Sequence, residues 1–370
     1  MDCTLDEITV KGFRSLKCLD KLKLRSINVL VGANGSGKSN FIGVFSLLHA
    51  LREGKLTDFT DKRGFANRIL HFGSKVTKEI QLRVSFLDGV NGYRVSLSPT
   101  DEDRFRVHDE VCWFWDKVRY PDKPYDLTLT GDAREAGISK PQQERTANWV
   151  RERLESWRTY HFHDTSDLSP MKQTADVDDN RFFRPDGSNL AAYLYFLRER
   201  HAESYDLIRR TVQSVAPFFN DFQLAPQQLN PSKIKLEWNH RSSDQYFDVS
   251  SLSDGTLRFI CLATLFLQPP EQRPSVIVVD EPELGLHPYA ITVLATMIKA
   301  ASRKTQVIVS AQSPLLLDHF EPEDVLVTER HEGATQIRRL ESLPLTEWLE
   351  DYSLGQLWEK NEFGGRPSRE

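Results

Sequence analysis

The chain alternates short apolar runs with longer segments in which apolar residues recur every three or four positions. The first pattern predicts β-strands and the second predicts helices. Residues 27–31, 276–279 and 307–310 are apolar at almost every position, which is typical of strands buried on both faces of a parallel sheet. Segments with helical spacing follow the first two runs. The pattern therefore predicts an α/β protein with a mostly parallel core sheet.

Other runs alternate apolar and polar residues, which predicts strands with one solvated face. Residues 5–10 and a run around residues 22–24 predict an edge hairpin near the N-terminus. Residues 80–86 and 93–97, separated by a turn with two glycines, predict a second antiparallel hairpin. We therefore expect an N-terminal antiparallel β lobe beside the core sheet.

The remaining chain is predicted to be mainly helical or irregular. No heptad is sustained long enough for a long coiled coil. We expect helices over 144–157, 189–219 (two), 289–301 and 348–358; strands over 159–163, 234–238 and 246–249; a loop over 64–73; an irregular surface excursion over 101–142; and a mobile loop over 168–187. We expect four parts: an N-terminal lobe (1–100), a helical insertion (101–245), a C-terminal lobe (246–320) and a tail (321–370).

Composition narrows the class of protein. The 370 residues are 39% hydrophobic and 27% charged, with a net charge of −5, so bulk charge gives no basic footprint for nucleic acid. The four cysteines form no C-x-x-C pair and are expected to be reduced packing residues. We expect a cytoplasmic protein with no membrane partner, because no leader pattern and no apolar run near the ~18 residues of a membrane span are visible.

Residues 32–39 fill the pattern G-x-x-x-x-G-K-[ST] between an apolar run and a helical pattern. Strand, glycine loop and helix is the setting that makes this motif a phosphate site, or P-loop. The loop and the helix N-terminus present N–H groups to an anion. Lys38 is expected to reach the β- and γ-phosphates of ATP, and the Ser39 hydroxyl to ligate Mg²⁺. The nucleotide-binding residues predicted here are Asn34, Gly35, Ser36, Gly37, Lys38, Ser39 and Asn40.

A second motif lies at the end of the apolar run 276–279, where Asp280 and Glu281 follow directly. This is the Walker B form, in which we expect Asp280 to hold Mg²⁺ and Glu281 to polarise the attacking water. The run 307–310 ends near Gln312. Because active groups gather at the carboxyl ends of parallel strands, these residues are expected to meet the P-loop.

Two pairs of residues keep alternative interpretations. Arg14 and Ser15 lie where the N-terminal hairpin can place a guanidinium beside a nucleotide, or they form a solvated turn. His161 and His163 face the same side of a predicted strand that ends at Asp164, and such a pair can bind a metal. No third strong ligand is evident from the spacing, so packing or hydrogen bonding is the preferred interpretation.

The order of these parts resembles the ABC-type ATPases, in the branch that includes SMC, RecF and OLD-family proteins. Residues 11–16 are similar to the N-terminal hairpin of that branch, and residues 251–256 to the ABC signature, usually L-S-G-G-Q. Residues 280–283 and 286–288 resemble its Walker B and D-loop. A wider likeness to stand-alone bacterial ATPases of this branch extends to residues 160–166, 186–190 and 351–355.

The resemblance implies a head-to-tail homodimer, or higher oligomer, that holds two ATP molecules between its chains. Each ATP would then touch the other chain's Ser253, Asp254 and Gly255, which open a helix with free N–H groups. The sequence departs from the pattern at Gln312, where many relatives carry a histidine, so hydrolysis is expected to be slow or partner-dependent. No glutamine is clearly the Q-loop residue, and Gln81 is only a candidate.

The resemblance also implies an ATP-driven switch. The tail is too short for an appended nuclease domain, so we expect a separate effector, a nuclease or toxin, in a bacterial defence or toxin-like system. The alternative is a RecF-like DNA-repair ATPase that binds DNA when ATP closes the dimer. A transporter ATPase subunit fits least, because no membrane-partner signature is visible.

Overall fold

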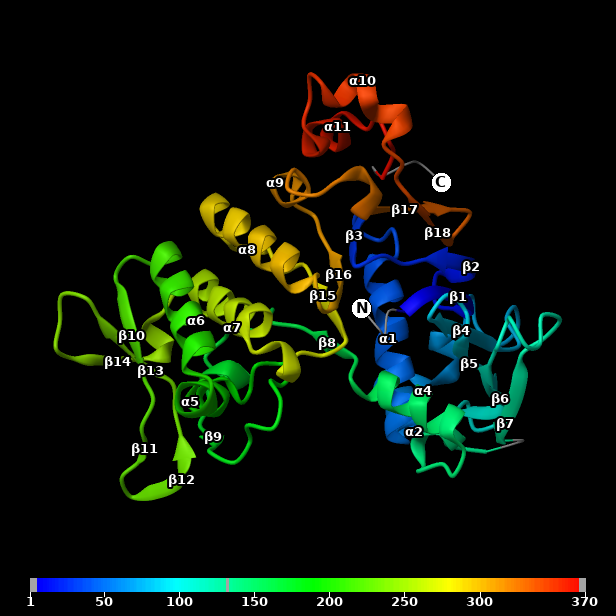
Figure 1. The fold of residues 1–370 in the computed structure, drawn as a ribbon, viewed down its shortest axis with the longest axis horizontal. Helices are drawn as coiled ribbons and strands as arrows, with labels where there is room; N and C mark the ends of the chain where they lie inside the picture. The colour runs from blue at the N-terminus through cyan, green and yellow to red at the C-terminus, as the bar shows by residue number, and fades with distance from the viewer. Residues whose placement is uncertain (1–4, 131–132, 366–370) are drawn as a thin grey trace.

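The computed structural model describes residues 5–130 and 133–365 (Figure 1). Two six-stranded sheets organise the chain, with helices between and around them. The N-terminal sheet and the helices α5 to α7 lie at opposite ends of the long axis, and the core sheet runs between them (Figure 1). The predicted α/β class, with a parallel core and an antiparallel N-terminal lobe, is confirmed.

The core sheet has the strand order β18-β17-β3-β16-β15-β8. All neighbouring pairs are parallel except β17 and β18. Its strands are β3 (Ile27–Val31), β8 (Arg158–Tyr160), β15 (Val276–Asp280), β16 (Gln306–Ser310), β17 (Val325–His331) and β18 (Ala334–Arg339).

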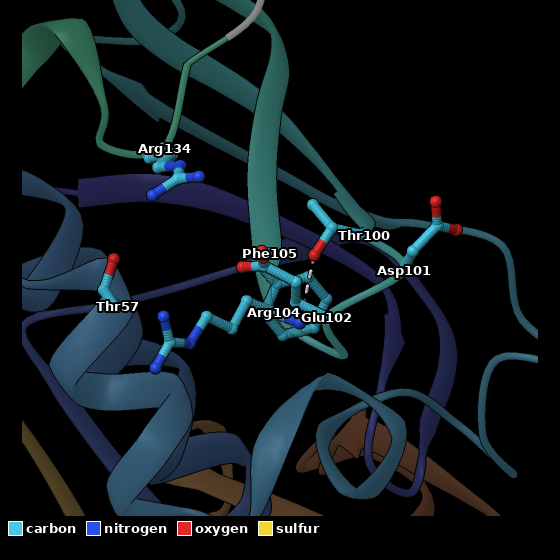
Figure 2. A pocket seen from close by; sticks show the side chains of 7 residues that line it. All are labelled: Thr57, Thr100, Asp101, Glu102, Arg104, Phe105 and Arg134. Atoms are coloured by element: carbon cyan, nitrogen blue, oxygen red, sulfur yellow. Dashed lines mark hydrogen bonds between the residues drawn. The ribbon is translucent and has the colours of Figure 1, made fainter.

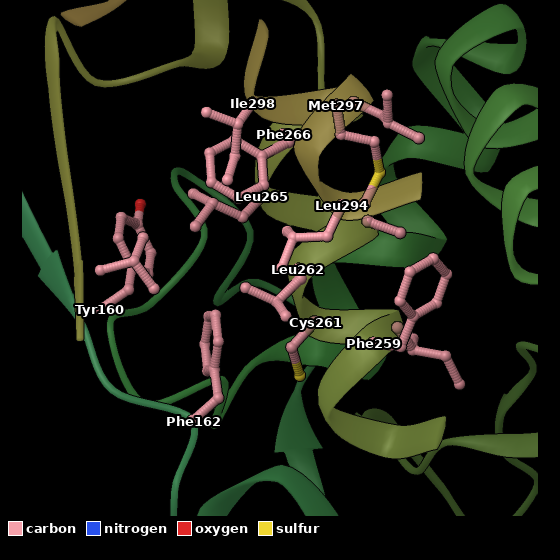
Figure 3. Packing of buried hydrophobic residues seen from close by; sticks show 14 of the residues in the cluster. Tyr160, Phe162, Phe259, Cys261, Leu262, Leu265, Phe266, Leu294, Met297 and Ile298 are labelled. Atoms are coloured by element: carbon pink, nitrogen blue, oxygen red, sulfur yellow. The ribbon is translucent and has the colours of Figure 1, made fainter. Parts of the chain in front are cut away.

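The nearly continuous apolar sequence of the central strands has a direct packing cause. On β15, Ile277 and Val279 face one hydrophobic core, whereas Val276 and Val278 face another. The first core lies against α7 (Asp254–Leu267) and α8 (Pro288–Ala301), as Figure 3 shows. The second lies against α1 (Lys38–Glu53) and the N-terminal sheet. Because both faces of the sheet are covered, most positions on these strands favour apolar residues.

The N-terminal sheet is antiparallel, with the order β2-β1-β4-β5-β6-β7. The predicted hairpins are confirmed, but the sheet is larger than expected, because residues 101–142 supply two of its strands instead of an irregular excursion. Residues 64–73 likewise contain a short helix, α3, where a loop was expected. The elements are β1 (Leu5–Phe13), β2 (Leu16–Lys23), α2 (Leu56–Lys62), α3 (Phe65–Ile69), β4 (Ile80–Phe86), β5 (Asn91–Pro99), β6 (Phe105–Phe114), β7 (Tyr125–Thr130) and α4 (Arg145–Glu155).

The insertion after β8 carries two helices, as expected, and two small three-stranded sheets. The longest helix of the described residues is α1, with 16 residues, so this part of the chain contains no long coiled coil. The insertion elements are β9 (Ala175–Asp176), α5 (Leu190–Arg200), α6 (Ala202–Val215), β10 (Phe219–Gln223), β11 (Pro226–Gln227), β12 (Asn230–Ile234), β13 (Glu237–His240) and β14 (Tyr246–Asp248).

The C-terminal segment differs from the expected single helix over 348–358. It forms α10 (Thr346–Leu349) and α11 (Leu354–Lys360), after the short helix α9 (Pro314–Leu317). Ser353 and Gln356 make a capping box that starts α11 as a separate helix. The four-part division of the chain stays a prediction; β6 and β7 belong to the N-terminal sheet, and β17 to the core sheet. Among the described residues, no helix is long and apolar enough to span a membrane.

Candidate functional site

The P-loop, Asp280, Glu281 and Gln312 lie at the carboxyl ends of three adjacent parallel strands. The P-loop follows β3, Asp280 ends β15 and Ser310 ends β16, which lies between them. Asp280 and Ser310 are register partners, and the Ser310 hydroxyl donates a hydrogen bond to the Asp280 carboxylate. The sheet topology therefore brings together residues that are about 240 positions apart in the sequence.

The P-loop has the backbone shape that its glycines allow. Gly35 and Gly37 have φ values of 81° and 110°, a region that side chains rarely adopt. Gly37 caps α1, and a Cβ at this position would overlap the Thr335 side chain. The hydroxyl of Ser36 is buried and has no hydrogen-bond partner among the described residues. Such an orphaned group inside a glycine loop fits a site that receives an additional acceptor or donor from a ligand.

Lys38 is folded onto its own loop. Its ammonium donates to the carbonyl oxygens of Gly32, at 2.6 Å, and Ala33, at 3.1 Å. Burial lowers the pKa of Lys38, while the nearby carboxylates of Glu281 and Asp280 act in the opposite direction. The ammonium thus lies among carbonyls at the loop mouth, where a phosphate can take over its hydrogen bonds.

The oxygen atoms near Lys38 suit a hard divalent cation. Ser39, at the first turn of α1, is exposed, and the Asp280 carboxylate lies at the end of β15, one strand beyond β16 in the same sheet. Hydroxyl and carboxylate oxygens together with water are the ligands that Mg²⁺ prefers. The residues present therefore fit Mg²⁺.

The N-terminal hairpin contacts the start of α1, as expected if Arg14 lies beside a bound nucleotide. The Arg14 guanidinium donates to the Asn40 amide oxygen at 3.4 Å, and the Asn40 amide donates to the Ser15 hydroxyl at 2.6 Å. Burial lowers the pKa of Arg14, and its φ of 49° marks the tight turn between β1 and β2. Arg14, Ser15 and Asn40 therefore form one hydrogen-bonded group beside the P-loop.

The sequence did not indicate Thr335 of β18, which links this group to the P-loop. Its hydroxyl contacts the Ser15 hydroxyl at 2.6 Å and donates to the Ser36 carbonyl at 2.8 Å. Its backbone N–H donates to the Ser15 carbonyl at 2.7 Å. A threonine on a C-terminal strand thus supports both the hairpin turn and the glycine loop, and only the fold reveals this role.

Glu281 and Gln312 meet directly. The Gln312 side-chain amide donates a hydrogen bond to the Glu281 carboxylate. Glu281 has a φ of 43°, an uncommon conformation for a residue with a side chain and one that is frequent at functional sites. Its backbone N–H donates to the Ser310 carbonyl at 2.9 Å, which holds the residue in this conformation.

Glu283 accepts hydrogen bonds from the loop that carries Gln312. One carboxylate oxygen accepts hydrogen bonds from the backbone N–H groups of Gln312, at 2.6 Å, and Ser313, at 3.1 Å. Burial raises the pKa of Glu283, and the charge of Glu281 adds to this effect. Glu283 was noted only as part of the motif; the structure gives it a positioning contact with the loop that carries Gln312.

The signature segment forms the start of α7. Ser253 is the N-cap, and its hydroxyl accepts from the Thr256 N–H at 3.2 Å. Ser253 and Asp254 are exposed, and a Cβ on Gly255 would lie 2.5 Å from the Gly285 carbonyl oxygen. In the described part of the chain, no hydrogen bond joins residues 253–255 to residues 32–39.

Arg258, one turn into α7, connects three segments, and sequence reasoning did not identify it. The side chain is 7% exposed. It donates to the carbonyls of Phe162 at 2.9 Å and His163 at 3.3 Å, and also to the Leu284 carbonyl. Arg258 therefore ties the start of α7 to the turn that contains Leu284 and to the segment after β8.

Gln81 is not brought to this site. It lies on β4, where its amide donates to the Glu79 carboxylate at 2.6 Å. It lines a cavity of about 370 Å³ on the antiparallel sheet together with Lys11, Asp20 and Arg83. No P-loop residue lines that cavity, so the structure gives no support to Gln81 as the Q-loop residue.

Two further cavities differ in their relation to the site. One of about 510 Å³ lies between the P-loop and the C-terminal segment, and its lining includes Gly32, Gln312, Trp358 and Gly365. The indole N–H of Trp358 is buried without a hydrogen-bond partner among the described residues. Figure 2 shows the other cavity, of about 270 Å³, lined by Thr57, Thr100, Asp101, Glu102, Arg104, Phe105 and Arg134, none of which is a predicted site residue.

Comparisons with known proteins identify the family and the fold of the chain. The family model described as "AAA domain, putative AbiEii toxin, Type IV TA system" matches residues 27–318. No curated protein sequence matches the chain. A solved SMC head bound to the C-winged helix domain of ScpA is 16% identical, with a TM-score of 0.59 over 92% of this chain and 99% of the other.

A second solved structure, an SMC head domain with an extended coiled coil bound to the C-terminal domain of ScpA derived from Pyrococcus furiosus, is 15% identical. It has a TM-score of 0.54 over 94% of this chain and 99% of the other. At 16% and 15% identity, the likeness to these two solved structures shows the fold alone. Because the family model covers most of the chain, the chain belongs to this AAA-domain family, and it has the fold of an ABC-type, SMC-like ATPase head.

Proposed function

We propose that the chain binds ATP with Mg²⁺ and hydrolyses it. The observation that carries this proposal is the convergence of the P-loop, Asp280, Glu281 and Gln312 at neighbouring strand ends. Lys38 would exchange its carbonyl partners for phosphate oxygens, and the N–H groups of the P-loop would surround the phosphates. Ser39 and Asp280 would hold Mg²⁺, which when bound neutralises the charge that develops on the phosphates.

Glu281 is the proposed group that orients the attacking water. Its carboxylate already accepts a hydrogen bond from Gln312, so water must share or replace this contact. Gln312 can donate a hydrogen bond to a γ-phosphate but does not titrate near neutral pH. We therefore expect slow basal hydrolysis, which a partner accelerates by changing the loop that holds Gln312.

We further propose that a second copy of the chain completes each site. Among the described residues, no hydrogen bond joins the start of α7 to the P-loop of the same chain, so we expect that one chain does not place both anion sites on one phosphate. A head-to-tail, two-fold dimer would place each signature segment over the other chain's P-loop. The exposed Ser253 and Asp254 support this arrangement.

The family description supports a switch in a toxin-like or defence system. ATP would close the dimer and hydrolysis would open it, and a separate effector, a nuclease or toxin, would respond. The resemblance of residues 11–16 and 251–256 to RecF-type ATPases leaves the alternative, in which the closed dimer binds DNA. Retention of DNA that requires ATP and falls with salt would favour this alternative.

Light scattering of the size-separated protein tests the proposed switch. We expect ATP with Mg²⁺ to shift the chain toward a dimer, or to tighten a dimer already formed, and Glu281→Gln to strengthen this effect because the bridging γ-phosphate persists. A monomer mass both with and without nucleotide, in a protein shown to bind ATP, would refute the dimer part of the proposal.

A further inference from the structure

Two histidines lie beside Asp280 at the edge of the proposed nucleotide site. β8 pairs with β15 in parallel, and Tyr160 is the register partner of Val279. His161 therefore leaves β8 at the level of Asp280, where β15 ends. One potential ligand atom each of His161, His163 and Asp280 lies within 4.8 Å of the other two. The third ligand that the H-x-H spacing lacked is thus supplied by a strand more than 110 positions away in the sequence.

The backbone directs both imidazoles to the same side. Tyr160 and Phe162 are 1% and 3% exposed and point into the core against α7 and α8 (Figure 3). His161 and His163 alternate with them and are both exposed. Because the intervening aromatic side chain is anchored in the core, neither histidine can turn inward without losing that packing.

Hydrogen bonds hold this segment in place. The His161 N–H donates to the Pro185 carbonyl at 3.0 Å, and Arg258 donates to the carbonyls of Phe162 and His163. The Nε2 atom of His163 is 2.9 Å from the Asp280 carbonyl oxygen. Since a carbonyl only accepts, Nε2 carries the proton and Nδ1 keeps the lone pair that a metal needs.

We propose that His161, His163 and Asp280 bind a divalent transition metal of the Zn²⁺, Co²⁺ or Mn²⁺ class. Two imidazole nitrogens and one carboxylate oxygen suit these ions, whereas Mg²⁺ prefers oxygen ligands. Three protein ligands leave further positions open to water. This site goes beyond the proposed ATPase, although Asp280 belongs to both.

The test uses the full-length chain without nucleotide, so that a failure of ATP binding does not affect it. Co²⁺ is titrated into the wild type and followed by its visible d–d absorption. The variant carries His161→Asn and His163→Asn together, and the matched control is His331→Asn, an exposed histidine at the end of β17. Circular dichroism and thermal unfolding compare the folding of all three proteins.

We expect the wild type and the control to bind one Co²⁺ per chain, and Mg²⁺ in large excess to leave this ion bound. The double variant should lose at least about tenfold in affinity, since even outer-shell partners of metal ligands are worth that much. Equal affinity of the double variant, or no saturable binding by the wild type, would overturn the proposal.

A second measurement uses only the wild type, so it remains valid if the double variant does not fold. Mn²⁺ bound to the wild type should show electron-spin coupling to ¹⁴N, because imidazole nitrogen would be directly coordinated. Bound Mn²⁺ without nitrogen coupling would place the ion on oxygen ligands only and would contradict the histidine site.

Discussion

The side-chain amide of Gln312 donates a hydrogen bond to the carboxylate of Glu281, across the ends of two neighbouring parallel strands. This contact connects the residue proposed to orient water with the residue that replaces the usual histidine. If Glu281 has this role, Glu281→Gln should retain ATP binding but lose turnover by about 100-fold or more. Phosphate release, measured in single-turnover and steady-state assays, gives the turnover, and a nucleotide titration gives the affinity for ATP. A variant that turns over at the parental rate would place the base elsewhere.

Lys38 gives the direct test of the phosphate site. Among the described residues, its ammonium donates hydrogen bonds only to carbonyl groups of the P-loop, so Lys38→Ala should remove ATP binding while the fold survives. Titration with a fluorescent nucleotide measures ATP binding, and thermal unfolding shows whether the variant is folded. The control is Lys62→Ala at an exposed position of α2, which should bind as the wild type does. Unchanged affinity in a folded Lys38→Ala protein would refute the site.

Burial raises the pKa of Glu283, so the folded protein holds this proton more tightly than the unfolded chain does. The resulting stability is fully present below the unfolded-state pKa and is lost as pH rises through the folded-state pKa. The free energy of unfolding of the wild type, relative to Glu283→Gln, should therefore decrease as pH rises. Urea unfolding across acidic to neutral pH measures the difference. The exposed Glu347→Gln is the control, and a difference that stays flat or increases would contradict the expectation.

Arg258 should contribute to stability through its hydrogen bonds to three backbone carbonyls. Arg258→Met keeps much of the side-chain volume but leaves one buried and two partly buried carbonyls without this donor, which costs about 1–3 kcal/mol. The exposed Arg303→Met is the control and should change stability by no more than about 0.5 kcal/mol. Urea unfolding compares the two variants, and equal effects would show that the connection has no energetic role.

The sequence was sufficient to predict those features that depend on short, local segments. The glycine loop and the apolar strands β3, β15 and β16 depend on short segments whose chemistry has few alternatives. Their convergence was predictable because parallel strands end at the same edge of a sheet. Ser353 and Gln356 carried the capping pattern that divides α10 from α11, a signal that sequence reasoning passed over.

Contacts between distant segments could not be predicted in this way. Glu110 interrupts the apolar pattern of β6, yet its carboxylate is fully buried and accepts hydrogen bonds from Tyr93 and from the Gly137 and Ile138 N–H groups. A buried acid with distant partners looks like a surface residue in a one-dimensional pattern. Thr335 and Arg258 were missed for the same reason, because their partners lie on other elements.

The sharing of sites between two chains is the central claim of the proposed function. It is tested with two separately impaired chains: Lys38→Ala, which lacks the phosphate contact, and Ser253→Arg. The arginine at the exposed N-cap of α7 should obstruct a packed interface, and this steric effect should outweigh the attraction of its charge for phosphate, since overpacking costs about 1–3 kcal/mol. Each hybrid dimer would keep one intact site, made of a wild-type P-loop and a wild-type signature segment.

The decisive measurement is the ATPase rate of an equal mixture of the two variants after proven subunit exchange. Each parent alone should be nearly inactive, and the mixture should recover roughly a quarter of the wild-type rate if chains pair at random and sites act independently, since half of the dimers are hybrids with one intact site. Full activity of either parent alone, or no recovery in the exchanged mixture, would contradict independent sites shared between chains.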